Sequence, residues 1–337
     1  MPGETKNTME CRSQETCPLC GAGGVVLAVD LTDRIFGCVD GVWRMRRCGN
    51  AACGTLWLDP RPLEAELGKA YAVYFTHGKS RRAAADQATA RPWLRILVRL
   101  ADGFFKRWHG VKAARRRHNL LGLPTGKGRR LLEVGCGGGK RLGLFRKHGW
   151  LVEGQDVDAA AVRQAQSAQG VPVHHGDLLH GLELPVGAYD AIVMNHVLEH
   201  VYDPVALLRV CHGLLAPGGI LAMATPNALS FGLREFGRDW MGLDVPRHLQ
   251  VFTSSALAET ARRAGFGRVK TWTEAAAKAS SFGIISLSLR RPGRFDMAAG
   301  PAPDLEWEAL RFQARALAEF RRDPASGEEL VLHAWKT

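Results

Sequence analysis

The second half of the chain alternates short apolar runs with stretches in which apolar residues recur every three to four positions. Runs of five to seven apolar residues predict buried strands, and the longer periodic stretches predict amphipathic helices. Regular alternation of the two is typical of a parallel sheet covered by helices, so the pattern predicts a doubly wound α/β fold. The predicted strands are 130–134, 151–156, 171–175, 189–194, 219–224, 268–273 and 329–335, and the predicted helices are 141–148, 159–169, 204–215, 254–264 and 304–320.

Two pairs of cysteines mark the beginning of the chain, with two strand-like stretches between them, 25–31 and 41–47. Four thiolates on two turns can surround one Zn²⁺ tetrahedrally, and the metal then replaces the core that so small a unit lacks. We therefore predict a zinc-ribbon-like module over residues 11–60 with a closed, structural site. The alternative is a set of four buried structural cysteines. The four residues are Cys17, Cys20, Cys48 and Cys53.

The remaining chain divides into a linker over 61–125 and a main domain over 126–337 with a helical insertion at about 275–328. In the linker, apolar residues fall at helical spacing and basic residues line another face, which predicts an amphipathic basic helix. Such a helix either packs on the main domain or touches a membrane surface through residues 91–117. The apolar positions are Trp93, Leu97, Leu100, Phe104 and Trp108.

The net charge of +12 comes from one segment of the chain. Residues 79–130 carry 15 Lys and Arg against 2 Asp and Glu, which leaves 30 basic and 31 acidic residues elsewhere. Such a patch suits nucleic acid, an anionic membrane or a phosphorylated substrate, or it is a solvated linker face. No run of eighteen apolar residues and no signal-peptide core is present, so we expect a cytoplasmic location.

A glycine-rich turn follows the first strand of the main domain. Glu133 ends that strand, and the glycines of 135–139 allow close approach of a ligand to the backbone. The helix that follows favours an anionic group at its N-terminus. Asp156 ends the next strand, where it suits a ribose, and Asp177 follows the third, where it suits an adenine amino group. Lys140 stands where a dinucleotide fingerprint requires its last glycine, so a dinucleotide is the weaker interpretation.

These segments resemble the class I S-adenosylmethionine-dependent methyltransferases over residues 129–275. The resemblance implies a seven-stranded, mostly parallel sheet with an antiparallel last strand, and S-adenosylmethionine as cofactor. It rests on LLEVGCGGG (131–139), GQDVD (154–158), HHGDL (174–178), YDAIVMNHVLEHVYDP (189–204) and LLAPGGILAMATPN (214–227). The implied cofactor-binding residues are Glu133, Gly135, Cys136, Gly137, Gly139, Asp156, Val157, Asp177, Leu178, Asn195 and His196.

The cysteine pairs and the run WMGLDVPRHLQVFTSSAL (240–257) also resemble a bacterial subset that joins a zinc module to this fold. Many members of that subset act in sugar, surface-polysaccharide or secondary-metabolite pathways. We therefore expect methyl transfer to oxygen or carbon of a small hydroxylated acceptor from such a pathway, and phosphorylated and nucleotide-linked compounds are among these acceptors. The alternatives are a methyltransferase of RNA or other nucleic acid, and a non-catalytic cofactor-binding scaffold whose zinc module holds a partner.

Four residues near the predicted switch point are candidates for catalysis: His196, Glu199, His200 and His248. Methyl transfer to a hydroxyl requires removal of a proton, and histidine is a base at neutral pH. If a helix starts at 196, the first three residues share one face. The ubiquinone-pathway O-methyltransferases and small-RNA 2′-O-methyltransferases, which this segment resembles, bind a divalent metal with a Glu/Glu/His set and a loop histidine. A local structural role, a base at His196 or His248, and a metal site therefore remain open.

One further loop combines positive charge with an aromatic ring. Bidentate contacts and stacking in this loop would suit a phosphate, and ordinary loop charge is the alternative. The residues are Arg234, Arg238, Trp240 and Arg247.

Overall fold

The computed structural model describes residues 7–72, 100, 103–104, 107, 110–276, 279–295 and 303–337. Trp93, Leu97 and Trp108 of the predicted amphipathic helix lie outside these residues, as does much of the 91–117 segment predicted to touch a membrane, whereas Leu100 and Phe104 are described and exposed. Within the described part of the chain, no helix has both the length and the apolar character that a membrane crossing requires.

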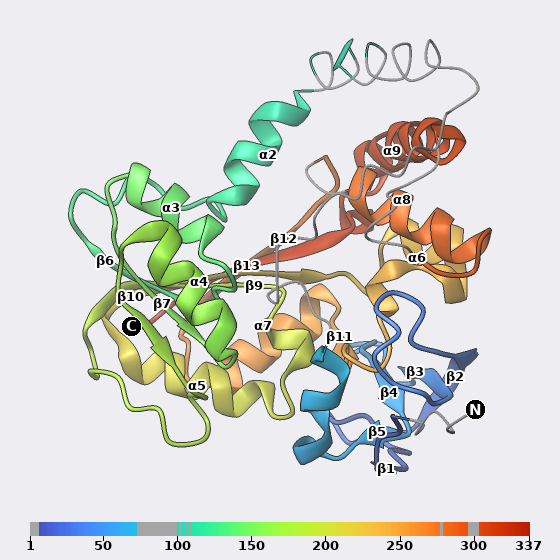
Figure 1. Cartoon of the computed structure of the whole chain (residues 1–337), viewed down its shortest axis with the longest axis horizontal. Coiled ribbons are helices and arrows are strands. Elements are labelled where there is room, and N and C mark those ends of the chain that lie inside the picture. Colours follow the sequence, from blue (N-terminus) through green and yellow to red (C-terminus); the bar gives the residue numbers. More distant parts are fainter. Residues whose placement is uncertain are drawn as a thin grey trace, which may run out of the picture.

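A seven-stranded sheet forms the centre of the molecule, in the order β12-β13-β10-β9-β6-β7-β8 (Figure 1). The last strand, β13 (Glu329–Trp335), runs antiparallel between β10 and β12. The doubly wound fold with an antiparallel last strand is therefore confirmed. The other strands are β6 (Arg130–Val134), β7 (Leu151–Asp156), β8 (Val173–His175), β9 (Tyr189–Asn195), β10 (Leu215–Pro226) and β12 (Arg268–Glu274).

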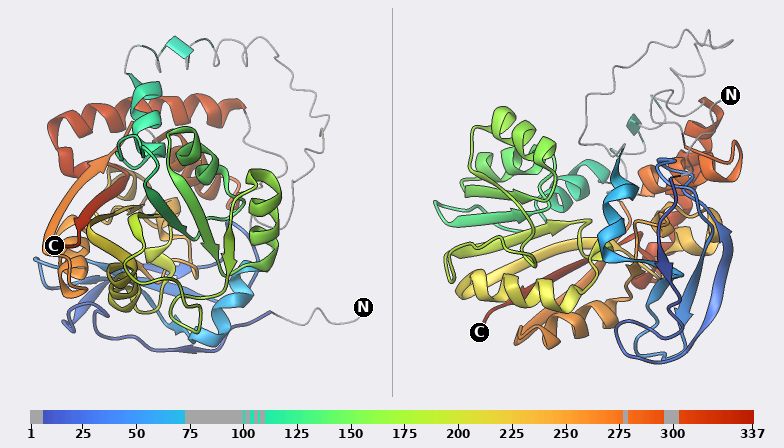
Figure 2. Two further views of the ribbon diagram at one scale, coloured as in Figure 1. Left: turned by 90° about the vertical axis from the view of Figure 1, so that its left-hand side faces the viewer. Right: turned by 60° about the horizontal axis from the view of Figure 1, so that its bottom comes forward.

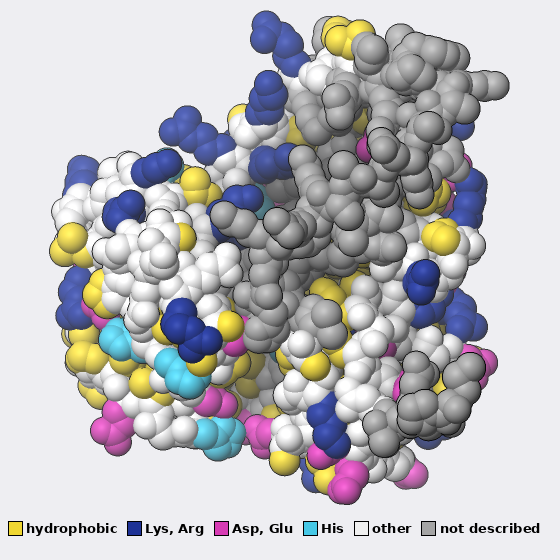
Figure 3. All heavy atoms as spheres, viewed as in Figure 1, with side chains coloured by type: hydrophobic (Ala, Val, Ile, Leu, Met, Phe, Trp, Pro, Cys, Tyr) yellow, Lys and Arg dark blue, Asp and Glu magenta, His cyan; other side chains and the backbone are white. Residues whose placement is uncertain are grey.

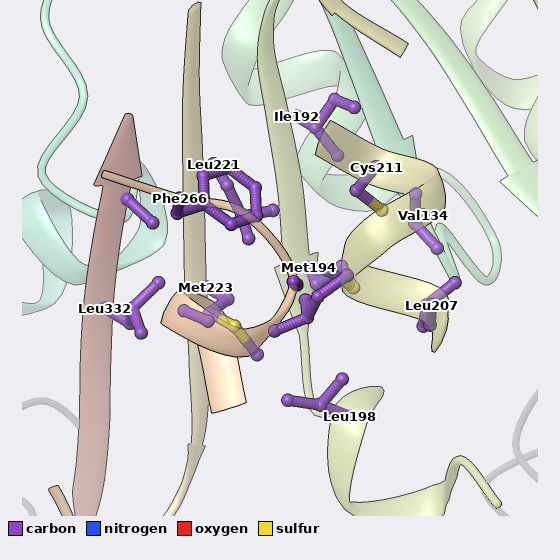
Figure 4. Close-up of a cluster of buried hydrophobic side chains, with 14 of the residues drawn as sticks. Val134, Ile192, Met194, Leu198, Leu207, Cys211, Leu221, Met223, Phe266 and Leu332 are labelled. Carbon is purple, nitrogen blue, oxygen red and sulfur yellow. The ribbon is translucent and has the colours of Figure 1, made fainter. Parts of the chain in front are cut away.

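Helices cover both faces of this sheet because successive strand residues point to opposite sides. Leu131 joins a buried cluster with Leu142 and Phe145 of α3, whereas Leu132 joins the cluster beneath α5 and α7. Figure 4 shows the second cluster, in which strand side chains meet Leu207 and Cys211 of α5. The helices are α3 (Lys140–Lys147), α4 (Ala159–Gln169), α5 (Pro204–Leu214) and α7 (Ser254–Arg263).

Helix α2 (Val111–Asn119) precedes the sheet and docks by a narrow face. Val111, Ala114 and His118 are buried at helical spacing, whereas Lys112 and the three arginines at 115–117 are exposed. Figure 3 shows this basic surface as dark blue side chains over α2. Helix α2 thus has a solvated basic face and an apolar side that packs on the main domain.

The N-terminal residues form a four-stranded sheet in the order β11-β4-β3-β2. Its outer strand β11 (Gln250–Val251) comes from the main domain and pairs antiparallel with β4 (Leu56–Asp59). A segment that is distant in sequence therefore completes the N-terminal sheet. The other elements here are β1 (Cys11–Arg12), β2 (Gly24–Leu31), β3 (Trp43–Cys48), β5 (Arg61–Pro62) and the 3₁₀ helix η1 (Glu64–Tyr71).

The predicted insertion contains two helices, α8 (Ala279–Arg290) and α9 (Pro303–Arg322). Only the second was predicted from the sequence. Phe282 and Phe312 of these helices share one buried cluster with Trp43 and Met45 of β3 and with Phe236 of α6 (Phe231–Phe236). Figures 1 and 2 show these helices and the N-terminal sheet on the side where β13 begins, opposite the C-terminus. The parallel strands end on this side. The remaining short helices are η3 (Leu198–His200), η4 (Gly237–Asp239), η5 (Met241–Leu243) and η6 (Pro324–Ser326).

Candidate functional site

The glycine turn after β6 is closed against the end of β7. Gly135, Gly137 and Gly139 all have positive φ, and a Cβ at Gly135 would lie 2.6 Å from Val197. Asp156 holds the turn, because its carboxylate accepts hydrogen bonds from Gly137 N at 2.8 Å and from Asp158 N at 2.9 Å. A Cβ at Gly137 would meet no atom of the described chain within 4 Å, so the turn leaves open space in front of its backbone.

Two buried oxygens beside this turn accept no hydrogen bond within the described part of the chain: Glu133 Oε2 and Asn195 Oδ1. Glu133 is the penultimate residue of β6, and Asn195 ends the neighbouring β9. Burial raises the pKa of Glu133 to about 8, although Arg141 Nε, 3.5 Å away, opposes the shift. Buried acceptors normally have partners, so both oxygens indicate a site for a ligand that brings donors.

The other predicted cofactor residues are divided between the turn and the core. The side chain of Cys136 packs in the core near Leu142, so this residue can offer only its backbone to a ligand. Leu178 is likewise buried in the cluster beneath α5, while Val157 is 64% exposed. Asp177 accepts from Leu179 N at 2.8 Å and lies 2.9 Å from His180 Nδ1. Helix α3 starts after Gly139 without a side-chain cap, which leaves its first N–H groups available to an anion.

A second group of polar side chains lies just beyond β9. Glu199, His200 and His248 each offer one ligand atom, and these atoms lie within 4.8 Å of one another. The Nδ1–H of His248 donates to Gly242 O at 2.8 Å, and His200 Nδ1 lies 3.1 Å from Arg247 O. Backbone carbonyls only accept, so His248 carries a proton on Nδ1, and His200 does so in the tautomer that donates to Arg247 O. Burial and the neighbouring His248 lower the pKa of His200 to about 4, which keeps this ring neutral.

The comparisons with known proteins identify the domain that contains these groups. A family described as "Methyltransferase domain" matches residues 105–271. A ubiquinone biosynthesis O-methyltransferase of Xanthomonas euvesicatoria is 33% identical over 179 residues, which cover 49% of this chain and 73% of that protein. The chain belongs to the S-adenosylmethionine-dependent methyltransferases.

Other relatives match over shorter shares of their length. A probable S-adenosylmethionine-dependent methyltransferase of Mycolicibacterium smegmatis is 32% identical over 49% of this chain and 60% of its own. A ubiquinone biosynthesis O-methyltransferase of Chromobacterium violaceum is 33% identical over 42% and 65%. The chain thus spans less than two thirds of these relatives. A solved methyltransferase structure from Mesorhizobium loti aligns with a TM-score of 0.45 at 18% identity, over 66% of this chain and 97% of that chain.

His196 lies between two carboxylates in this structure. Its Nδ1 lies 3.0 Å from Glu199 Oε1, and its Nε2 bonds to Glu329. With a carboxylate at each ring nitrogen, both nitrogens donate and no lone pair remains. Burial alone would lower the pKa of His196, but Glu329 and Glu199 outweigh it and raise that pKa to about 9. This geometry favours a structural role for His196, and a base at 196 stays an untested prediction.

No α-helix starts at 196, so the condition for one shared helical face is not met. His196 adopts a left-handed conformation with φ of 55°, and only the 3₁₀ turn Leu198–His200 follows it. Glu199 nevertheless points back to His196 and accepts from the Thr225 hydroxyl at 2.9 Å. Burial alone would raise the pKa of Glu199, but the histidines around it, His196 above all, lower it to about 2.

The predicted phosphate-binding loop is mainly structural. Arg247 is fully buried, and its guanidinium binds Asp33 bidentately at 2.6 and 3.0 Å. It also contacts Asp244 at 2.6 Å, and Trp240 is only 1% exposed. Arg247 and Trp240 are thus unavailable to a phosphate. Through its ion pair with Asp33, Arg247 instead connects the loop that carries His248 to the N-terminal residues.

The four predicted metal-ligating cysteines lie together at one end of the N-terminal sheet. Cys17 Sγ is 3.8 Å from Cys53 Sγ, and Cys20 Sγ is 3.4 Å from Cys48 Sγ. All four sulfurs lie within 4.8 Å of one another. Sulfurs 2.3 Å from a tetrahedral zinc are about 3.8 Å apart, so the thiol geometry fits that ion.

Sequence reasoning missed two residues that reach the cluster from other elements. Glu329 opens β13 and is fully buried, and Tyr71 of η1 places its hydroxyl 3.0 Å from His200 Nδ1. The signal for the first was present, because two consecutive glutamates stand directly before an apolar strand. Charged residues that adjoin a strand buried on both faces need partners within the protein.

Proposed function

We propose that this chain transfers a methyl group from S-adenosylmethionine to a hydroxyl oxygen of a small acceptor. The observation that carries the proposal is the position of two unpaired buried acceptors, Glu133 Oε2 and Asn195 Oδ1, beside the glycine turn. Their chemistry fits the ammonium group of the methionine portion, which must donate all its hydrogens. Asp156 uses one lone pair of each oxygen for the turn and keeps others for ribose hydroxyls.

The acceptor side of the proposal rests on Glu199, His200 and His248. Their donor set, one carboxylate and two imidazoles whose Nδ1 atoms lie against backbone carbonyls, fits a divalent cation. Such an ion acts as a Lewis acid on a hydroxyl. The chain would bind this ion through the Nε2 atoms of His200 and His248. Hydrogen bonds to Thr225 and His196 hold the Glu199 carboxylate in place. The relatives named ubiquinone biosynthesis O-methyltransferases support a hydroxyl as the methyl acceptor.

The cysteine cluster is assigned a separate, structural Zn²⁺. Four thiolates close the coordination shell, so no position remains for a substrate. This assignment supports the resemblance to the bacterial subset that carries a zinc module. Sugar and secondary-metabolite intermediates then belong in the acceptor screen beside quinol precursors.

The test uses the full purified chain with methyl-labelled S-adenosylmethionine. Calorimetry measures binding of S-adenosylhomocysteine, and the labelled donor is offered to catechols, nucleotide sugars, glycolipids and RNA. We expect cofactor binding and labelling of a hydroxyl compound that is lost in His248→Ala and after mild chelation that leaves zinc bound. Absence of S-adenosylhomocysteine binding would refute the methyltransferase proposal. Labelling of RNA alone would favour a nucleic-acid substrate, and full activity without a bound cation would remove the cation from it.

A further inference from the structure

A buried row of alternating histidines and glutamates leads from helix α2 to the Glu199 cluster. His118 Nε2 lies 3.1 Å from Glu329 Oε2, and the other oxygen of Glu329 bonds to His196 Nε2. His196 Nδ1 then lies 3.0 Å from Glu199 Oε1, and Thr225 donates to Glu199 Oε2. The side chains of His118, Glu329 and Glu199 have no solvent exposure, whereas that of His196 is 23% exposed. His196 is therefore the member of the row that faces the open part of the site.

The antiparallel direction of β13 explains how Glu329 reaches this place. Glu329 pairs with Pro226 at the end of β10 and with Glu274 at the end of β12. Because β13 runs against its neighbours, its first residue stands where the parallel strands end. The last strand thus supplies a carboxylate to the catalytic edge of the sheet, 133 residues along the chain from His196.

His196 requires outside support to keep its conformation. A left-handed backbone is sterically unfavourable for a residue with a Cβ, and it persists only where the surroundings fix it. The backbone N–H of His196 donates to Ala224 O at 2.9 Å, and the two carboxylates hold the ring. Glu329 is one of these two carboxylates, and it bonds to Nε2 of His196 from a different strand of the sheet.

We propose that Glu329, supported by His118, is a positioning residue that fixes the ring of His196 and thereby the carboxylate of Glu199. This inference rests on the proposed function, because the positioned carboxylate belongs to the cluster that would act on the acceptor. Glu329 sets the direction from which Glu199 faces His200 and His248, and it does so without contact to cofactor or acceptor.

Helix α2 has a second connection, to the cofactor side. Arg141 donates to Asn119 O at 2.5 Å and to His118 O at 3.4 Å, both at the C-terminal end of α2. The same guanidinium lies 3.5 Å from Glu133, one of the unpaired acceptors beside the glycine turn. The end of α2 is therefore fixed to both halves of the site, and a change at His118 should affect acceptor chemistry more than cofactor affinity.

The test compares Glu329→Gln with Glu328→Gln in the full chain. Glu328 is the adjacent, equally buried residue, but it accepts from Gly232 N and Trp240 Nε1 instead of from the row. Glu328→Gln therefore removes a buried carboxylate and disturbs one hydrogen bond outside the row, which controls for general disturbance of the buried core. Loss of a charge-assisted hydrogen bond predicts a fall in kcat of about tenfold or more for Glu329→Gln. Glu329→Asp, which keeps the charge but shortens the side chain, should be equally impaired, and Glu328→Gln should resemble the natural protein.

Nuclear magnetic resonance of ¹⁵N-histidine provides a readout that does not depend on the acceptor. The ring nitrogens of both His196 and His118 should shift in Glu329→Gln and remain unchanged in Glu328→Gln, while binding of S-adenosylhomocysteine is retained. Unmoved His196 resonances, an unchanged kcat, or an equal loss of cofactor affinity in both variants would overturn the inference. A natural protein that labels no acceptor refutes the proposed function alone, because the resonances still decide whether Glu329 positions His196.

Discussion

Glu133 is a buried residue of the site whose hydrogen-bonding capacity is not fully used by the described residues. Its carboxyl group is buried at the end of β6, one oxygen has no partner among the described residues, and Arg141 is its nearest cation at 3.5 Å. In the absence of a ligand, burial therefore favours the protonated form, with a pKa of about 8. A bound ammonium group would supply the missing donor and favour the carboxylate.

This pKa makes stability without cofactor depend on pH. The pKa of Glu133 is about 8 in the folded chain against 4.5 for an ordinary glutamate. The folded state keeps the proton while the unfolded chain loses it, so the stabilising contribution is complete below pH 4.5 and is lost as the pH rises to 8. Through this group, the free energy of unfolding falls by at most about 1.4 kcal/mol per pH unit.

Glu133→Gln cannot ionise and should show a flatter decline of Tm between pH 5 and 8 than the natural protein. Thermal unfolding followed by fluorescence in cofactor-free buffer measures the slope. The exposed Glu183→Gln serves as the control and should retain the natural slope. Equal slopes for Glu133→Gln and the natural chain would contradict this prediction. The same variant should also bind S-adenosylmethionine about tenfold more weakly, because a charged hydrogen bond becomes neutral.

The role of His196 could not be predicted from the sequence. Its spacing to Glu199 and His200 was visible, and the structure does bring these three residues together. The second carboxylate at its ring comes from Glu329, however, and pattern within one segment says nothing about a contact across 133 residues. Glu133 and Asp156 were predictable because strand ends and glycine turns are local features.

At the scale of elements, the strands of the central sheet and the helices that cover it were predictable. The pattern of apolar residues that is typical of each is strong in this part of the chain. Helix α4 was predicted at its observed bounds, Ala159–Gln169. Helix α8 was not predicted, because its sequence ASSFGIISLSLR is rich in serine and β-branched residues and has no clear polar face. It is helical because Phe282 and its neighbours enter a core shared with α9 and the N-terminal sheet.

The loop that carries His248 depends on a buried ion pair between two elements. The side chains of Arg247 and Asp33 have no solvent exposure. Asp33→Asn therefore removes a negative charge that neutralises the buried guanidinium of Arg247. We expect a loss of about 3 kcal/mol in the free energy of unfolding, measured by chemical denaturation. Glu259→Gln breaks the exposed pair with Arg262 and should cost less than about 1 kcal/mol. A comparable small loss in Asp33→Asn would show that the loop does not depend on this pair.

Across the whole molecule, the N-terminal sheet and the methyltransferase domain share structure. Strand β11, which completes the N-terminal sheet, begins at Gln250, two residues after His248. The cysteine cluster packs against Ala256 of α7, and Trp43 joins the core of α6, α8 and α9. The order of the N-terminal sheet therefore affects the acceptor side of the site, whereas the glycine turn lies on the central sheet.

This division predicts a selective effect of zinc removal. Cys20→Ser should lose the metal, lower Tm and abolish methyl transfer, because β11 and the His248 loop lose their support. Binding of S-adenosylhomocysteine should change by less than about threefold, since Glu133 and Asp156 belong to strands distant from the cysteines. Metal analysis, thermal unfolding, calorimetry and the labelled-donor assay measure the four quantities. Cys11→Ser, an exposed thiol outside the cluster, is the matched control and should retain metal and activity. If Cys20→Ser lost cofactor binding and activity together, the N-terminal sheet would support the whole fold instead of the acceptor side.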